Sequence, residues 1–279
     1  MVFREQKMSH RNKCVVILFS VLIVFFFYAY FNNRYYEKSA TIYQIDFLQQ
    51  LSGIENLSSL TFHREQKLLY ATQNRPATLL KLNLKGELLH SVPVPFLSDA
   101  ETIEHICGNI FAAIDESTSE LFFFSVSDDM TITLRNSIPL QKFNKKNQGF
   151  EGIAWNSGEK FLYAAKERKP HIVFTWQLSQ NLFSATPVQL PKFPYQVDVD
   201  DISALDYSDG KLLVLSDESG VLLETEHTGK TYIEVLRLKQ GNHGLTEDIP
   251  QPEGVVRTPD GSIYIASEPN LIARFRPVQ

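Results

Sequence analysis

Apolar and polar residues alternate in short segments along most of the chain after residue 50, and Gly, Pro, Asn and Asp separate these segments. Alternation with a period of two is typical of β-strands that bury one face. No segment in this region has the period of an amphipathic helix. The pattern therefore predicts an all-β domain.

One two-strand unit recurs five times in the same phase, about fifty residues apart. The clearest copy begins at Glu151 (EGIAW) and continues after a turn as FLYAAKE, and the last copy begins at Glu253 (EGVVR) and continues as IYIASE. Each unit runs on into another alternating segment. The first positions of the five units are Ser58, Glu101, Glu151, Ser203 and Glu253.

Four strands in each repeat of this length make one blade of a β-propeller. A two-sheet sandwich would also have many short strands, but it would not repeat its sequence in a fixed phase. The fifth unit has only three strands before Gln279, whereas Thr41–Phe47 is strand-like and has no blade of its own. Because propellers close by pairing strands from the two termini, we expect Thr41–Phe47 to complete the last blade. Residues 41–279 are predicted to form a five-bladed β-propeller.

A single long apolar run lies before this domain. Residues 14–31 (CVVILFSVLIVFFFYAYF) carry no charge and are long enough to span a bilayer as a helix. A cleaved signal peptide would have a shorter run and small residues at its cleavage site, but this run ends in Tyr30 and Phe31. We interpret it as an uncleaved transmembrane signal anchor, followed by a linker at 32–40.

Charge sets the expected orientation of this anchor and limits the partners of the domain. The tail, residues 1–13, has four basic residues and one acid, and the positive-inside rule places it in the cytoplasm. The domain is then expected in the periplasm or cell exterior, on a single-pass protein of the inner (cell) membrane. Residues 1–38 carry about +4 and the rest about −9, and an acidic domain does not suit nucleic acid.

Glutamates gather at equivalent positions of the repeat. The first strand of each blade lines the channel of a propeller, and the antiparallel second strand returns to the same rim. Seven of the ten residues at these two positions are Glu. The second-strand positions are Asn74, Glu116, Glu167, Glu218 and Glu268.

Crowded carboxylates repel one another unless they bind protons or a cation. Ca²⁺ prefers six to eight oxygen ligands, and the loops before the first strands add further oxygens, from Asp99, Gln148, Asp200, Asp201 and Gln251. We predict a site for a hard cation, for which Ca²⁺ is a suitable ion, with Glu101, Glu151 and Glu253 as ligands and Asp201 as a further candidate. In the alternative, strand-start glutamates accept backbone N–H bonds and pair with Arg75, Arg168 and Lys169.

The histidines and cysteines indicate no other chemistry. The domain's six histidines are scattered, so their spacing predicts neither a catalytic triad nor a zinc or copper site. His105 and His243 are the two that could reach a channel mouth. Cys107 is expected to be a small packing residue in a turn beside Gly108, and with Cys14 the only other cysteine, no disulfide can form within the domain.

These units resemble those of the SdiA-regulated family, the YjiK-like bacterial membrane-anchored proteins, which are distantly similar to NHL-repeat propellers. The segments that carry the resemblance are DAETI, NQGFEGIAW, DVDDISALDY and IPQPEGVVRTPDGSIYIASEPN, and it covers residues 42 to 277. The resemblance implies a five-bladed propeller with a calcium ion and no established activity. Ser58 and Ser203 stand where other units have an acid, so this chain departs from a uniform acidic ring.

Two classes of function follow. The first is a calcium-binding interaction or sensing module that presents its loops to an envelope protein or a small-molecule ligand. The second is a metal-dependent hydrolase of lactones or phosphate esters, in which the ion activates water. A hydrolase needs an open coordination position with a general base beside it, whereas a structural site is closed by protein ligands. No catalytic residue is predicted, and the non-enzymatic reading is preferred.

Overall fold

The computed structural model describes residues 36–140, 149–182, 184–187, 195–226 and 231–278. The chain divides into two compact units, Met1–Glu37 and Lys38–Gln279, and the second contains the β-domain. The predicted tail (1–13) and membrane anchor (14–31) lie outside the described residues. Within the described ranges, no helix has the length and apolar character to cross a membrane.

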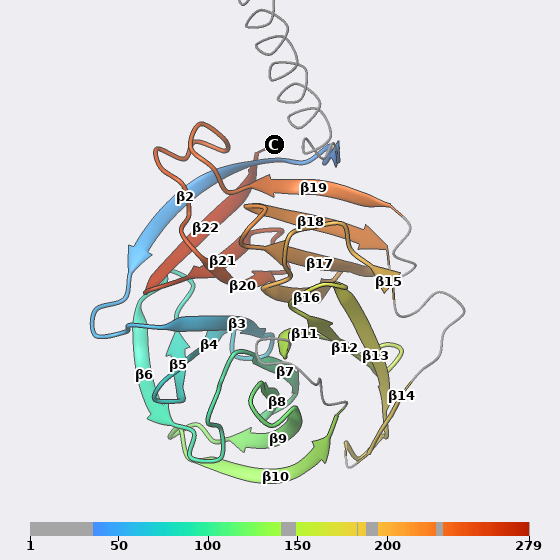
Figure 1. Ribbon diagram of the computed structural model, residues 1–279. Helices are drawn as coiled ribbons and strands as arrows, with labels where there is room; N and C mark the ends of the chain where they lie inside the picture. The colour runs from blue at the N-terminus through green and yellow to red at the C-terminus, as the bar shows by residue number, and fades with distance from the viewer. Residues whose placement is uncertain (1–35, 141–148, 183, 188–194, 227–230, 279) are drawn as a thin grey trace, which may run out of the picture. The chain divides into compact units, whose positions relative to one another are not determined.

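Five antiparallel sheets radiate from a common axis, as the prediction of a five-bladed propeller requires (Figure 1). Blade 1 contains β3 (Leu57–His63), β4 (Leu68–Gln73), β5 (Thr78–Leu82) and β6 (Leu88–Pro93). Blade 2 contains β7 (Glu104–Cys107), β8 (Ile110–Asp115), β9 (Glu120–Val126) and β10 (Ile132–Pro139). Blade 3 contains β11 (Phe150–Asn156), β12 (Phe161–Lys166), β13 (Ile172–Leu178), β14 (Ala185–Pro187) and β15 (Tyr195–Gln196).

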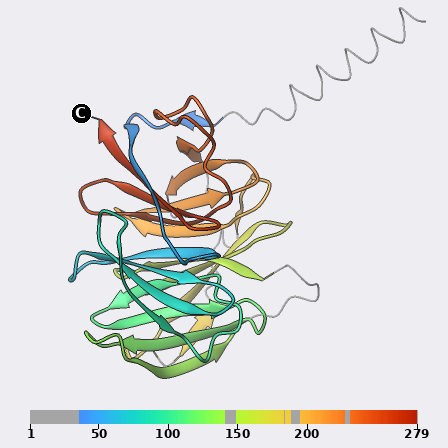
Figure 2. The same cartoon turned by 90° about the vertical axis from the view of Figure 1, so that its left-hand side faces the viewer.

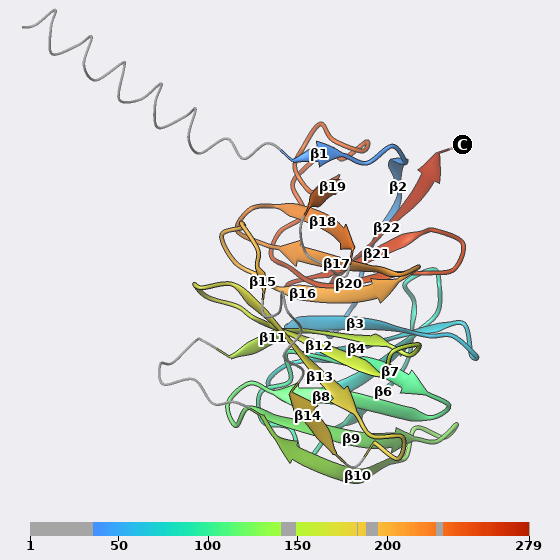
Figure 3. The same cartoon turned by 90° about the vertical axis from the view of Figure 1, so that its right-hand side faces the viewer.

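The last two blades use strands from the N-terminal part of the described chain. Blade 4 contains β16 (Ala204–Ser208), β17 (Lys211–Ser216), β18 (Val221–Glu226) and β19 (Tyr232–Arg237), with β1 (Glu37–Lys38) as its outer edge. Blade 5 contains β20 (Pro252–Arg257), β21 (Ile263–Ser267), β22 (Leu271–Val278) and β2 (Ile42–Gln50). Figures 2 and 3 show the sheets from the side.

Strand β2 closes the ring. It pairs antiparallel with β22 along its whole length, from Ile42 opposite Val278 to Gln50 opposite Leu271, and in Figure 1 the blue β2 runs beside the red β22. This confirms that Thr41–Phe47 belongs to the last blade. The pairing covers an edge of β22 that would otherwise be open to another chain.

The apolar core lies between neighbouring blades. Four clusters of buried side chains bridge blades 4 and 5, 5 and 1, 1 and 2, and 2 and 3. Blades 3 and 4 meet through stacked Tyr163 and Tyr207 rings, whose centroids are 5.7 Å apart. The inner strands β3, β7, β11, β16 and β20 contact one another in turn around the axis. Sheets packed face to face in this way fix the positions of the inner strands.

Two details of the repeat differ from the sequence prediction. The first strand of blade 2 begins at Glu104, not at Glu101, so Glu101 lies in the segment leading into β7. Cys107 is exposed at the end of β7, so the expectation that it packs inside the domain was wrong. The tight turn through Gly108, which has a positive φ of 54°, directs the chain back into β8 at this point.

Candidate functional site

Three of the five axial positions are β-bulge residues. In blade 3, Phe150 pairs with Lys166 and Gly152 with Ala165, which leaves Glu151 as the extra residue of its strand. Glu253 and Ser58 occupy the same place in blades 5 and 1. A bulge turns one side chain out of the regular alternation and is common beside functional sites.

The axial positions of the other two blades precede the inner strand. Glu101 lies between an isolated bridge, Ala100 to Asp115, and the start of β7. Ser203 precedes β16, and its N–H donates to the carbonyl of Leu215 at 3.0 Å. In all five blades the axial residue thus stands at an irregular strand start.

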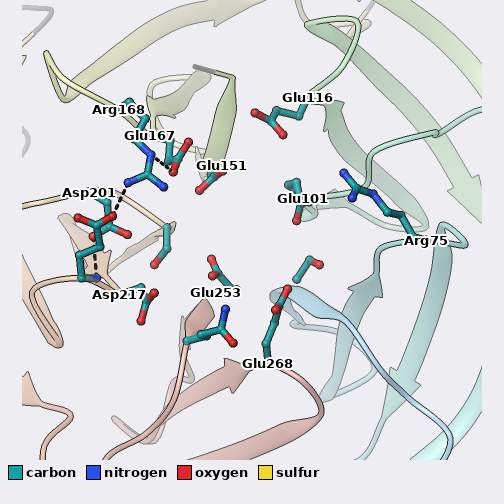
Figure 4. Close-up of a pocket in the computed structure, with 14 residues that line it drawn as sticks. Arg75, Glu101, Glu116, Glu151, Glu167, Arg168, Asp201, Asp217, Glu253 and Glu268 are labelled. Carbon is teal, nitrogen blue, oxygen red and sulfur yellow. Dashed lines mark hydrogen bonds and ion pairs between the residues drawn. The ribbon is translucent and has the colours of Figure 1, made fainter. Parts of the chain in front are cut away.

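The axial residues and the ends of the second strands line one cavity of about 300 Å³ (Figure 4). We call it the acidic cavity. Its lining residues are Ser58, Arg75, Glu101, Glu116, Glu151, Glu167, Arg168, Asp201, Ser203, Asp217, Glu218, Gln251, Glu253 and Glu268. All four predicted metal ligands are among them, as are all seven glutamates of the repeat.

Glycines leave room for this crowding. A Cβ at Gly149 would lie 1.9 Å from Cγ of Glu116, and the Gly149 N–H donates to Oε1 of Glu116 at 3.2 Å. A Cβ at Gly254 would lie 2.8 Å from backbone atoms of β3, and one at Gly152 would lie 3.0 Å from backbone atoms of β16. The Glu-Gly pair of the repeat therefore combines an axial carboxylate with a close approach of the next blade's inner strand.

Two arginines neutralise part of the cavity. Arg168 pairs with both Glu167 and Glu218, and Arg75 contacts Asp99 at 3.2 Å between Nη2 and Oδ1. Asp201 is held within the protein, because its Oδ1 accepts hydrogen bonds from Ser216 Oγ at 2.5 Å and from the Glu218 N–H at 3.0 Å. The arginine pairing considered from the sequence is thus present for Glu167 and Glu218.

The three predicted glutamate ligands have no such cation. Among the described residues, no Arg or Lys makes an ion pair with Glu101, Glu151 or Glu253. The amide of Asn74 donates to Oε1 of Glu101 and to Oδ1 of Asp99. Asn74 occupies the second-strand position at which the other four blades have a glutamate, and its amide orients Glu101.

Burial and mutual repulsion raise the pKa values of these carboxyl groups. Desolvation, with repulsion from Asp99, raises the pKa of Glu101 to about 7. Desolvation, with repulsion from Asp217, raises the pKa of Glu253 to about 9. Glu151 is coupled to its neighbours, and burial and then Glu167 and Glu253 raise its pKa most strongly. In the ion-free cavity these acids hold protons at a pH where isolated glutamates have lost them.

The closest sets of carboxylates only partly match the predicted ligands. One set joins Glu116, Glu151 and Glu167, and another joins Asp99, Glu101 and Glu116, with oxygens within 4.8 Å of one another. Glu116 is common to both, although its place at the end of a second strand did not single it out. Glu253 and Asp201 line the same cavity outside these sets, and Gln148 lies outside the described residues.

The other ends of the inner strands form a second cavity of about 220 Å³. Buried Glu104 and Asp206 line it, together with Trp155, Tyr207 and His105. Desolvation raises the pKa of Asp206 to about 6, and burial together with Asp206 raises that of Glu104 further above its ordinary range. His105 therefore reaches this channel mouth, opposite the acidic cavity.

His243 instead has a structural role. Its Nδ1 bonds the carbonyl of Tyr43 at 3.0 Å, and its Nε2 accepts the Arg237 N–H at 3.1 Å. These bonds tie the loop after β19 to the closing strand β2.

Two solved structures and one family model match the chain. The crystal structure of Myxococcus xanthus glutaminyl cyclase is similar with a TM-score of 0.58 and 17% identity, covering 87% of this chain and all of that one. A luciferin-regenerating enzyme matches with a TM-score of 0.48 and 10% identity, over 83% of this chain and 95% of that one. At 17% identity, the likeness to the glutaminyl cyclase relates the folds alone. The family model described as SdiA-regulated matches residues 36–276, and the chain therefore belongs to the SdiA-regulated family.

Proposed function

We propose that the acidic cavity binds Ca²⁺ and that the propeller is a calcium-binding interaction or sensing module. The observation that carries the proposal is the convergence of seven glutamates, Asp201 and Asp217 on a cavity of about 300 Å³ with two arginines. Without an ion, these carboxyl groups reduce their repulsion by binding protons. A divalent cation would offset that repulsion directly.

The donors in the cavity suit calcium. Its lining residues supply carboxylate, hydroxyl and amide oxygens and include no His or Cys, which zinc and copper sites use. Ca²⁺ accepts six to eight oxygens in flexible geometry, whereas Mg²⁺ requires a near-ideal octahedron and keeps more of its water. A wide ring of glutamates from different blades matches the first requirement better than the second.

The two close carboxylate sets indicate which residues would hold the ion. Glu116 and Glu151 would be direct ligands from neighbouring blades, and Glu101 would join them from the side of Asp99. Asn74 would orient Glu101, and the Gly149 N–H would orient Glu116. The positive charge of Arg168 would reduce the repulsion that Glu167 and Glu218 exert on the other carboxylates.

Calcium titration of the chelator-treated protein tests this proposal, with magnesium as the matched control. We expect a selective rise in melting temperature and a saturable heat of binding with calcium. A Glu151→Ala variant should lose most of both responses. If the variant and the parent have equal stability and an equal calcium response, any ion binds elsewhere. If the parent itself does not respond to calcium, protons and arginines alone neutralise the cavity.

We further propose that residues 14–31 anchor the module in the inner membrane with the propeller in the periplasm or cell exterior. The uncharged run and the basic tail before it support this topology. Protease added to intact spheroplasts should digest the loops of the propeller, and alkaline washing should leave the chain in the membrane pellet. Protection from the protease until lysis would reverse the orientation.

A metal-dependent hydrolase is the alternative, and one observation favours testing it. The pKa of Glu101, about 7 in the ion-free cavity, lies in the range that a general base uses near neutral pH. Calcium-loaded protein should then cleave lactones or phosphate esters, and at saturating calcium Glu101→Gln should lower the activity more than its weaker calcium affinity accounts for. If neither substrate class is cleaved faster than in buffer alone, the hydrolase alternative is excluded and the binding module remains the proposed function.

A further inference from the structure

Two histidines that are far apart in the sequence stack on one another at the second channel mouth. His63 ends β3 and His105 lies in β7, and their ring centroids are 4.0 Å apart with an angle of 21° between the planes. Both side chains are buried. They meet because β3 and β7 are neighbouring inner strands of the propeller.

One carboxylate oxygen lies close to a ring nitrogen of each histidine. Oε2 of Glu65 is 3.2 Å from Nδ1 of His63 and 3.7 Å from Nε2 of His105. The side chain of Glu65 is 61% exposed, so it can adjust its position. Two ring nitrogens and a carboxylate oxygen thus converge on one point.

The hydrogen bond that His63 accepts places two acceptor atoms next to each other, with no cation between them among the described residues. The Gln66 N–H donates to Nδ1 of His63 at 3.3 Å, which makes Nδ1 an unprotonated acceptor that faces another acceptor, Oε2 of Glu65. This contact between two acceptors is electrostatically unfavourable, which is a conflict. A metal cation between the nitrogen and the oxygen would resolve it.

We propose that His63, Glu65 and His105 form a binding site for a divalent transition-metal ion of the Zn²⁺ class. Their ligand atoms lie within 4.8 Å of one another, and two imidazoles with one carboxylate are ligands that zinc prefers over calcium. None of the three lines the acidic cavity. The site is therefore separate from the proposed calcium site in position and in chemistry.

Metal binding requires a small rearrangement around His105. Its Nε2 now donates to the Gly108 carbonyl at 2.9 Å; to bind a metal through Nε2, the ring would give up this bond and change tautomer, losing the Nε2 proton and taking one up on Nδ1. Glu65 and His105 both line the second cavity. Three protein ligands leave at least one coordination position, which water or a small ligand entering this cavity would fill.

The test is titration of the full-length chain, purified in detergent, with zinc and then cobalt at saturating calcium. A Cys107→Ser background removes the exposed thiol as a ligand. We expect one zinc per chain and, with cobalt, the strong visible absorption of a low-coordinate site. Removing a direct ligand should weaken binding at least about ten-fold, as losses in the outer shell already do.

Two variants and one control decide the outcome. Glu65→Gln changes an exposed side chain and leaves the core intact, and His105→Gln removes a ring ligand; both should weaken binding. His90→Gln changes an exposed histidine on β6 of the same blade and should bind zinc like the parent. The proposal is overturned if zinc binding is absent at saturating calcium, or if Glu65→Gln and His105→Gln bind zinc as tightly as His90→Gln.

Discussion

At the scale of single residues, the carboxyl groups of the acidic cavity have raised pKa values. Glu101 and Glu253 have pKa values of about 7 and about 9 because burial disfavours their charge and neighbouring acids repel it. In the proposed site, calcium and protons would compete for the same oxygens. Calcium affinity should rise with pH, and calcium binding should release protons.

The first prediction concerns the pH dependence of the chelator-treated protein. An acid whose pKa is raised in the folded state stabilises the fold below its unfolded pKa and loses that contribution as pH rises through the folded pKa. From Glu101 and Glu253 the loss falls between about pH 4.5 and about pH 9. The free energy of unfolding should fall by at least about 2 kcal/mol from about pH 5.5 to about pH 8.

Urea titrations at the two pH values measure this fall, and saturating calcium should abolish it. Buried His63 acts in the opposite direction, because its lowered pKa costs stability as pH falls. A Glu101→Gln/Glu253→Gln double variant keeps this histidine and isolates the carboxyl contribution. A double variant with the same pH slope as the parent would contradict the assignment.

The second prediction concerns Glu151, whose pKa is raised most strongly by burial and neighbouring acids. Glu151→Gln should stabilise the ion-free protein at about pH 8 by about 1 to 2 kcal/mol, since each pKa unit of upward shift corresponds to about 1.4 kcal/mol. The same change should weaken calcium binding. Glu247→Gln, at an exposed position, is the control and should change neither quantity. Thermal melting with and without calcium separates the two effects.

At the scale of the element, each blade adapts its inner strand to the axis. Bulges in β3, β11 and β20 direct Ser58, Glu151 and Glu253 into the cavity. The following glycines of β11 and β20 let the next inner strand approach closely. One Glu-Gly pair thus sets both the chemistry of the rim and the spacing of the blades.

The third prediction follows from this spacing. Gly254→Ala should destabilise the protein by about 1 to 3 kcal/mol, the usual cost of overpacking, because the new Cβ would lie 2.8 Å from the backbone of β3. Gly158→Ala is the control, since its Cβ would meet its nearest atom, Oδ1 of Asn156, at 3.4 Å. Urea unfolding should separate the two variants. Equal losses would mean that the blades can move apart at little cost.

The repeat allowed the blade number, the closing strand and the acidic rim to be predicted, because each follows from alternation and phase. It could not reveal the bulges, since each lies after the first residue of its strand, where too little alternation precedes it to show a change of phase. The importance of Glu116 also depends on a contact between blades 2 and 3, through Gly149. The stacking of His63 and His105 likewise arises from packing between blades, and no local spacing signals it.

At the scale of the whole molecule, ring closure by β2 joins the two ends of the described chain. The buried ring of Tyr43 packs in the cluster between blades 4 and 5, and the carbonyl of Tyr43 bonds His243. Leu51, just after β2, is buried in the cluster between blades 5 and 1. Strand β2 therefore supports the packing on both sides of its own blade.

The fourth prediction is that removing this strand opens the ring. A chain beginning at residue 52 should lose cooperative unfolding and form oligomers through the uncovered edge of β22. A chain beginning at residue 36 is the control and should remain folded. Size-exclusion chromatography and urea unfolding report the two properties, and a monomeric, cooperatively unfolding short chain would show that blade 5 is stable with three strands.

Closure by β2 also has a consequence for biosynthesis. Strand β2 leaves the ribosome first among the strands of blade 5, but its partner β22 ends at Val278. At about 5 to 20 residues per second, β2 waits roughly 10 to 50 seconds with its edge unpaired. During that interval the nascent chain exposes Tyr43, Ile45 and Phe47, which the finished blade covers. The chain is therefore most open to pairing with other chains before its last strand is made.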